Sequence, residues 1–214
     1  MKLRLGVLAS GRGTNLQAMI DSTKRGDLEA QVTVVVVDQP EAQARERARQ
    51  AGIPEFFVDY GAFPDRESAE RRIISILERH EVELVCLAGF MRILTPVFLK
   101  AYKNRIMNIH PSLLPAFPGI GAQRQALEHG VRYTGCTVHF VDQAVDAGPI
   151  IIQAVVPVRH DDTVESLSDR ILEQEHCIYL EAIQLYLEGR LELEGRRVRI
   201  HPEKFTRSRR DRCP

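Results

Sequence analysis

The run from Val32 to Val37 constrains the fold of this chain more than any other feature. It contains five valines and one threonine, and it has no charged residue. A strand with one face in solvent alternates apolar and polar residues, whereas a strand buried on both faces is apolar throughout. Strands of the second kind are typical of parallel sheets that helices cover on both sides. The run therefore predicts an α/β protein with a central parallel sheet.

Further apolar runs alternate with stretches of helical periodicity. We expect strands at 3–9, 55–58, 84–88 and 106–109, and helices that begin near Leu16 and cover 40–50 and 64–80. Strands that alternate with helices are joined by right-handed crossovers in a parallel sheet. The pattern predicts a Rossmann-like, doubly wound and mostly parallel sheet.

The second half of the chain follows a different pattern. Segments 135–141 and 150–156 are predicted strands joined by a short turn, which indicates a late antiparallel hairpin in the same sheet. A helix is expected at 123–129. Another helix follows Asp162, whose spacing to Glu165 resembles a capping box.

Composition limits the class of protein. Of the 214 residues, 44% are hydrophobic, which is enough for one core but short for two. We therefore expect a single domain over 1–200 and a basic, flexible tail over 201–214. The net charge is zero, which argues against nucleic-acid or membrane partners for the whole surface. There is no recognisable signal peptide or membrane span, so we expect a cytoplasmic protein.

The four cysteines are widely separated and have no Cys-x-x-Cys spacing, which fits a reducing compartment. No set of ligands with metal-site spacing is apparent in the sequence. We therefore expect no metal.

A glycine-containing loop follows the first predicted strand. Its sequence is Ser10-Gly11-Arg12-Gly13-Thr14-Asn15, and it leads into the first helix. Backbone N–H groups at such a junction can bind an anion, so the loop is a candidate phosphate site. It matches neither the dinucleotide fingerprint nor the P-loop. The alternative is a glycine turn that only packs a helix, but ligands of doubly wound sheets gather beyond the carboxyl ends of strands.

Asn108 and His110 lie two residues apart at the end of a predicted strand. Residues with this spacing share one face of a strand, so both side chains can point at one ligand. Pro111 and Pro115 restrict the loop that follows, which predicts a fixed arrangement. The alternative interpretation is a strand-end histidine held by ordinary hydrogen bonds.

Asp146 lies in the turn between the two late strands, close to Gly148. Aspartate is common in turns for conformational reasons alone. A functional role requires the turn to fold back over His110, where a carboxylate would favour the imidazolium and orient the ring. His139 is a second imidazole in the same hairpin, and we interpret it as structural.

Two further features are candidates for binding. Glu175 lies at the edge of the apolar stripe of the last helix, either as a salt-bridge partner or as a hydrogen-bond acceptor in a cleft. Segment 88–96 carries apolar side chains out of a strand. It either lines a pocket for a flat apolar ligand or forms the first turn of a packed helix.

Taken together, these motifs resemble the glycinamide ribonucleotide formyltransferases, which are folate-dependent enzymes of purine synthesis. The resemblance extends to about Ile200. It rests on the segments Asn108-Ile109-His110-Pro111-Ser112-Leu113-Leu114-Pro115, Leu87-Ala88-Gly89-Phe90-Met91-Arg92-Ile93-Leu94, Asp146-Ala147-Gly148-Pro149 and Gln174-Glu175-His176. The first motif is shared with other enzymes that use 10-formyltetrahydrofolate. The glycine loop, Glu175 and the chain length indicate the acceptor.

The resemblance implies a role for each matching residue. Asn108, His110 and Asp146 would be catalytic. Glycinamide ribonucleotide would be bound by Gly13, Thr14, Asn15 and Glu175. Folate would be bound by Arg66, Met91, Arg92, Ile93, Leu94, Asn108, Val141 and Asp142. Many relatives have histidines where this chain has Gly121 and Gln123, so the supporting role of an imidazole at these positions does not carry over to this chain.

The implied reaction is formyl transfer from 10-formyltetrahydrofolate, the co-substrate, to the amine of glycinamide ribonucleotide, without a metal. Asn108 and protonated His110 would stabilise the oxyanion, and Asp146 would keep His110 charged. The implied partners are these small molecules, and the protein would be a monomer or a homodimer. Two alternatives remain at this stage: a 10-formyltetrahydrofolate hydrolase, and a non-catalytic folate- or nucleotide-binding protein.

Overall fold

The first five strands form the parallel part of one sheet. The protein is represented by a computed structural model that describes residues 2–202. The strands are β1 (Leu3–Ala9), β2 (Ala30–Val37), β3 (Glu55–Phe57), β4 (Leu84–Leu87) and β5 (Ile106–His110). They lie in the order β3-β2-β1-β4-β5, and all their pairings are parallel. The predicted doubly wound sheet is thereby confirmed.

Later strands extend the same sheet. They are β6 (Tyr133–Phe140), β7 (Ile150–Pro157), β8 (Leu191–Glu194) and β9 (Arg197–Ile200). β6 pairs antiparallel with β5 and with β7, which confirms the late hairpin. β8 and β9 form a second antiparallel hairpin beyond β7 that the sequence analysis did not identify.

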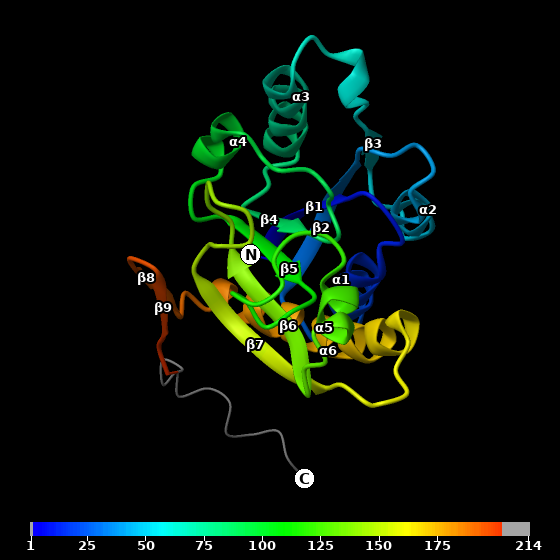
Figure 1. Ribbon diagram of the computed structural model, residues 1–214. Helices are drawn as coiled ribbons and strands as arrows, with labels where there is room; N and C mark the ends of the chain where they lie inside the picture. The colour runs from blue at the N-terminus through cyan, green and yellow to red at the C-terminus, as the bar shows by residue number, and fades with distance from the viewer. Residues whose placement is uncertain (1, 203–214) are drawn as a thin grey trace.

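Helices cover both faces of the sheet (Figure 1). They are α1 (Thr14–Arg25), α2 (Gln43–Gln50), α3 (Arg66–Arg79), α4 (Pro96–Ala101), α5 (Ala122–Glu128) and α6 (Val164–Leu187), with a short 3-10 helix η1 (Tyr60–Ala62). Helices α1, α2 and α6 bury their apolar side chains in one core cluster. Helices α3 and α4 bury theirs in a second cluster on the other face.

The valine run in β2 shows why the sheet needs both helical layers. Val35 and Val37 belong to the first core cluster, whereas Val34 and Val36 belong to the second. All four side chains have no measurable exposure. The strand is therefore buried on both faces, as its continuous apolar sequence predicted.

The chain changes direction across the sheet between β1 and β4. From β1 the chain moves outward through β2 to β3, and it then returns to β4 and continues to β5. The loops after β1 and β4 therefore leave in opposite directions, which opens a crevice at the carboxyl edge. The loop 10–13 follows β1, the segment 88–95 follows β4, and His110 ends β5.

The start of α6 corrects one detail of the sequence analysis. The capping box consists of Thr163 and Ser166, and not of Asp162 and Glu165. Asp162 lies one residue earlier and forms an ion pair with Arg170, with 2.7 Å between Oδ1 and Nη2. Both residue pairs have capping spacing, and the structure selects the pair with two hydroxyl groups.

The described chain ends at residue 202, inside the predicted tail. His201 donates its backbone N–H to the carbonyl oxygen of Arg190 at 2.8 Å, and its ring lies 2.6 Å from a carboxylate oxygen of Glu192. His201 is therefore attached to the fold, and positions 203–214 of the predicted tail lie outside the described residues. Between residues 2 and 202, no helix is both long enough and apolar enough to cross a membrane.

Candidate functional site at the carboxyl edge of the sheet

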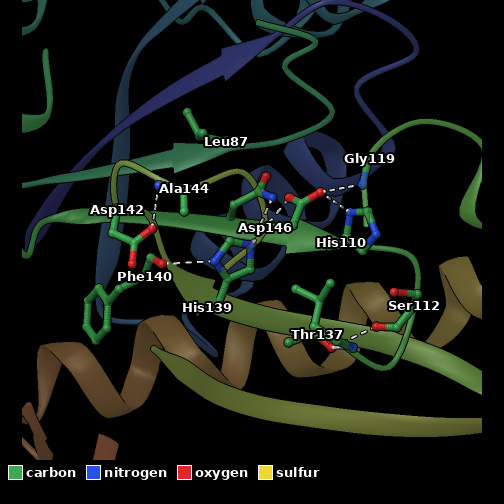
Figure 2. Close-up of polar contacts among 12 residues, drawn as sticks. Leu87, His110, Ser112, Gly119, Thr137, His139, Phe140, Asp142, Ala144 and Asp146 are labelled. Atoms are coloured by element: carbon green, nitrogen blue, oxygen red, sulfur yellow. Dashed lines mark hydrogen bonds and ion pairs between the residues drawn. The ribbon is translucent and has the colours of Figure 1, made fainter. Parts of the chain in front are cut away.

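Asn108 and His110 lie on one face of β5, as their spacing predicted. Met107 and Ile109 point to the opposite face and belong to the core cluster beneath α6. The His110 ring is 5% exposed. Its Nε2–H donates to the carbonyl oxygen of Phe117 at 2.9 Å. Its Nδ1 lies 3.4 Å from Oδ2 of Asp146, so the turn between β6 and β7 does fold back over His110 (Figure 2).

The backbone of the turn holds Asp146 in this position. Asp146 has φ 50°, in the left-handed region, which aspartate tolerates better than most side chains. Its Oδ2 also accepts a hydrogen bond from the backbone N–H of Gly119 at 2.8 Å. Gly148 packs so closely that a Cβ there would lie 1.8 Å from the carbonyl oxygen of Phe140. Only glycine permits the return of the chain at this position.

His139, which the sequence analysis interprets as structural, lies in the same cluster. It lies opposite Asn108 in the β5–β6 register. Its Nδ1–H donates to the carbonyl oxygen of Phe140 at 2.9 Å, and its Nε2 lies 3.2 Å from Nδ2 of Asn108. Burial lowers the pKa of His139, which favours the neutral ring. A neutral ring with its proton on Nδ1 can accept the Asn108 amide hydrogen at Nε2.

The second group of predicted residues lies at the first turn of α1. Gly13 is the N-cap of α1 with φ 67°, and a Cβ there would lie 2.9 Å from Cα of Ala44. Thr14 is the first residue of the helix and is half-buried. The close approach of α2 is therefore a structural reason for glycine at this position, besides its proposed role toward an anion.

Asn15 and Glu175 are brought together from α1 and α6. The Nδ2 of Asn15 donates to Oε2 of Glu175 at 2.8 Å. Burial raises the pKa of Glu175 above its ordinary value, although the Asn15 hydrogen bond and the charge of Arg12 lower it. The Oδ1 of Asn15 is buried and has no hydrogen-bond partner. The Glu175 carboxylate and the Oδ1 of Asn15 can each accept a hydrogen bond from a hydroxyl group of a ligand.

The predicted folate residues lie mainly in the segment after β4. Met91 and Ile93 are 73% and 56% exposed, whereas Leu94 is buried. The guanidinium of Arg66 donates to the carbonyl oxygen of Ile93. Val141 and Asp142 lie across the site in the β6–β7 turn, where Asp142 Oδ1 accepts the backbone N–H of Ala144 at 3.0 Å.

Arg92 has two partners that the sequence analysis did not identify. Its Nε lies 2.6 Å from Oδ2 of Asp38, which is buried at the end of β2. Its guanidinium also lies over the ring of Tyr60, at 4.3 Å from the centroid. Both partners precede Arg92 by more than 30 positions, so no local spacing could have indicated them. These contacts fix the side chain of Arg92 and the segment that carries it.

Within residues 2–202, no group of three or more His, Cys, Asp or Glu side chains is arranged to hold a metal ion. The polar cluster is formed instead by an amide, two imidazoles and a carboxylate. Together with the two loops on the same edge, it defines an α/β domain that binds small molecules at the crevice of a doubly wound sheet.

Comparison with known proteins identifies the family. A family model described as formyl transferase matches residues 3–183. The chain is 44% identical over 191 residues to phosphoribosylglycinamide formyltransferase of Escherichia coli (strain K12), covering 89% of this chain and 90% of that protein. The crystal structure of glycinamide ribonucleotide transformylase 1 from Symbiobacterium toebii superposes with TM-score 0.93 at 55% identity, covering 94% of this chain and 95% of that chain.

A longer relative is the trifunctional purine biosynthetic protein adenosine-3 of Gallus gallus, which is 46% identical over 192 residues. The match covers 90% of this chain but 19% of that protein, so the chain spans about a fifth of its length. The chain belongs to the formyl transferase family, and within it to the phosphoribosylglycinamide formyltransferases.

Proposed function

We propose that this chain transfers the formyl group of 10-formyltetrahydrofolate to the amine of glycinamide ribonucleotide. Family membership supports the reaction class. The observation that carries the proposal is the contact between His110 and Asp146, beside Asn108 and on the same sheet edge as the glycine loop. Such a cluster suits a reaction in which negative charge develops on a carbonyl oxygen.

Attack of the amine on the formyl carbon produces an oxyanion. The Asn108 amide has one N–H directed at His139 and a second N–H that can donate to this oxygen. The Nε2–H of His110 donates to the Phe117 carbonyl, and the oxyanion would take the place of that carbonyl as acceptor. The carboxylate of Asp146 lies 3.4 Å from Nδ1 of His110 and orients the ring for this donation.

Proton transfer completes the reaction. The attacking amine must lose a proton, and the folate nitrogen that leaves must gain one. Asp146 lies beside His110 and is accessible enough to exchange a proton through ordered water, so it is our candidate for the relay. No step in this scheme requires a metal ion.

The binding residues follow the two loops. Gly13, Thr14 and Asn15 would hold the ribose phosphate at the start of α1, and Glu175 would accept from the sugar hydroxyls. Met91, Arg92, Ile93 and Leu94 would hold the pteridine together with Val141 and Asp142. Arg66 would meet the glutamate tail of the folate.

The proposal implies a cytoplasmic enzyme with small-molecule partners. All the named residues come from one chain, so either a monomer or a homodimer could contain a complete site. Light scattering after size-exclusion chromatography distinguishes these two states.

The acceptor provides the sharpest test of the function. We expect glycinamide to be at least ~10³-fold poorer than glycinamide ribonucleotide in kcat/KM, because binding energy from the phosphate and ribose positions the reacting amine. That ratio corresponds to ~4 kcal/mol. Formyl transfer is followed by the absorbance change on formation of tetrahydrofolate. Formate release at the same rate without acceptor would instead favour the hydrolase, and binding without turnover would favour a non-catalytic protein.

A further inference from the structure

Strands β1 and β4 separate at the crevice, and Ser10 connects them beyond this point. The backbone N–H of Ala88 donates to the carbonyl oxygen of Leu8 at 2.9 Å, just past the end of β4. The N–H of Ser10 then donates to the carbonyl oxygen of Gly89 at 3.1 Å. These bonds continue the β1–β4 ladder for one step after both strands have ended.

The side chain of Ser10 makes one further bond. Its Oγ accepts the backbone N–H of Met91 at 2.9 Å. Ser10 therefore holds both neighbours of Phe90, whose ring is buried in the second core cluster. The folate segment 88–95 and the phosphate loop 10–13 are thus joined by a backbone bond and a side-chain bond of one residue.

The opposite side of the phosphate loop is attached to α2. The carbonyl oxygen of Gly11 accepts from the N–H of Ala44 at 3.2 Å, and that of Arg12 accepts from Nε of Arg47 at 2.8 Å. A loop attached on that side cannot absorb a shift of Ser10 freely. Movement of the folate segment is therefore transmitted to the backbone that leads into Gly13 and Thr14.

We propose that Ser10 is a positioning residue that couples the binding of the two substrates. A ligand that orders either loop would order the other through the Ser10–Met91 bond, so the second ligand binds at a smaller entropic cost. This inference rests on the proposed function, because it assigns one substrate to each loop.

The test is a thermodynamic binding cycle with tetrahydrofolate, which lacks the formyl group, and glycinamide ribonucleotide. The dissociation constant of tetrahydrofolate is measured by calorimetry with and without saturating glycinamide ribonucleotide. For the unmodified protein we expect at least about fivefold tighter binding in the presence of the second ligand. For Ser10→Ala we expect the ratio to fall to within about twofold of one, because a single neutral hydrogen bond has about this effect.

Two variants serve as controls. Ser10→Thr keeps the hydroxyl and should retain the coupling. Ser168→Ala removes a hydroxyl that donates a hydrogen bond to the carbonyl oxygen of Val164 within α6, and it should leave the coupling unchanged. A general loss of structure would weaken binding of each ligand alone and lower the unfolding temperature, whereas the proposal predicts a change in the ratio. If Ser10→Ala does not fold, Ser10→Cys offers a weaker acceptor of similar shape and should also reduce the ratio.

The possible outcomes distinguish an error in the role of Ser10 from an error in the proposed function. Equal coupling in the unmodified protein and Ser10→Ala would overturn the role of Ser10, and so would two ligands that bind the unmodified protein independently. Failure of either ligand to bind the unmodified protein, both alone and in the presence of the other, would overturn the proposed function, and this inference with it.

Discussion

The amide of Asn108 is oriented by a histidine that must stay neutral. His139 accepts from Asn108 at Nε2 only while Nδ1 carries the single ring proton, and burial maintains this state by lowering the pKa of His139. His110 is held differently, with Phe117 at one nitrogen and Asp146 at the other. The two neighbouring imidazoles are therefore held by different sets of partners.

The pairing of His110 with Asp146 predicts a non-additive effect on catalysis. His110→Ala and Asp146→Asn should each reduce kcat by ~10²-fold or more with a modest loss of folate binding, since both groups act on developing charge. The double variant should lose less than the product of the two effects, because one group orients the other. Steady-state kinetics of the four proteins test this. A loss equal to the full product would show that the two residues act independently.

Glu175 predicts a conflict between stability and binding. Its buried carboxylate has a raised pKa, and the Oδ1 of Asn15 has no donor. In Glu175→Gln, an amide removes the buried charge and can donate to that oxygen, so we expect ~1 kcal/mol more stability at pH 8. Binding of glycinamide ribonucleotide should weaken roughly tenfold, because a neutral acceptor replaces a charged one.

Urea unfolding and calorimetry measure these two quantities for Glu175→Gln. The same substitution at Glu173, which is exposed on α6, is the matched control and should change neither. A less stable Glu175→Gln protein would show that the carboxylate stabilises the fold.

At the scale of elements, Gly13 determines how closely α1 and α2 approach. Gly13→Ala places a methyl group against Cα of Ala44 and requires an L-residue at φ 67°. We expect a loss of at least ~2 kcal/mol, because the left-handed conformation alone costs roughly 1–2 kcal/mol and the methyl contact adds to it. Chemical denaturation measures the loss.

Gly11→Ala is the control for that measurement, because a Cβ at Gly11 meets no atom within 4 Å. It should change stability by less than ~0.5 kcal/mol. Equal effects at the two positions would contradict the packing argument. Weaker binding of glycinamide ribonucleotide by Gly13→Ala does not by itself prove a phosphate contact, because the substitution also displaces the start of α1.

The strands β1 to β7 and the helices α1, α2, α3, α5 and α6 could be predicted from their apolar patterns. The 3-10 helix η1 and the six-residue helix α4 were not predicted. The β8–β9 hairpin carried a signal too, since apolar and charged residues alternate on both sides of Gly195, but its strands are only four residues long each. The shared face of Asn108 and His110 followed from strand geometry. The contact of His139 with Asn108 depends on the register between β5 and β6, and the ion pair of Asp38 with Arg92 depends on tertiary structure, which no local pattern specifies.

At the scale of the whole molecule, the buried His139 and the half-buried His176 predict how stability changes with pH. Burial lowers the pKa values of His139 and His176. Below the ordinary histidine pKa of 6.5, the unfolded chain binds protons that the folded protein does not. Stability therefore falls as the pH decreases from 6.5 toward the lower folded values. Buried Glu70 and Glu175 act in the opposite direction, because their raised pKa values favour proton uptake by the folded state.

Replacing both histidines isolates their contribution from that of the carboxyls. The free energy of unfolding of the unmodified protein should fall more steeply between about pH 7 and pH 5 than that of the variant His139→Gln/His176→Gln. Urea titrations at several pH values compare the two slopes. Identical slopes would show that neither imidazole resists protonation in the folded protein.

The β8–β9 hairpin also affects how one copy of this protein meets another. An uncovered strand at the margin of a sheet presents free N–H and C=O groups and can recruit a strand from a second molecule. Here a hairpin pairs with the first residue of β7, Ile150, and within it Glu192 lies opposite Arg199 and Glu194 opposite Arg197. An incoming strand would have to match this alternation of sign, or leave charges facing like charges. At this end of β7 the hairpin therefore favours partner strands with the complementary charge pattern and disfavours others.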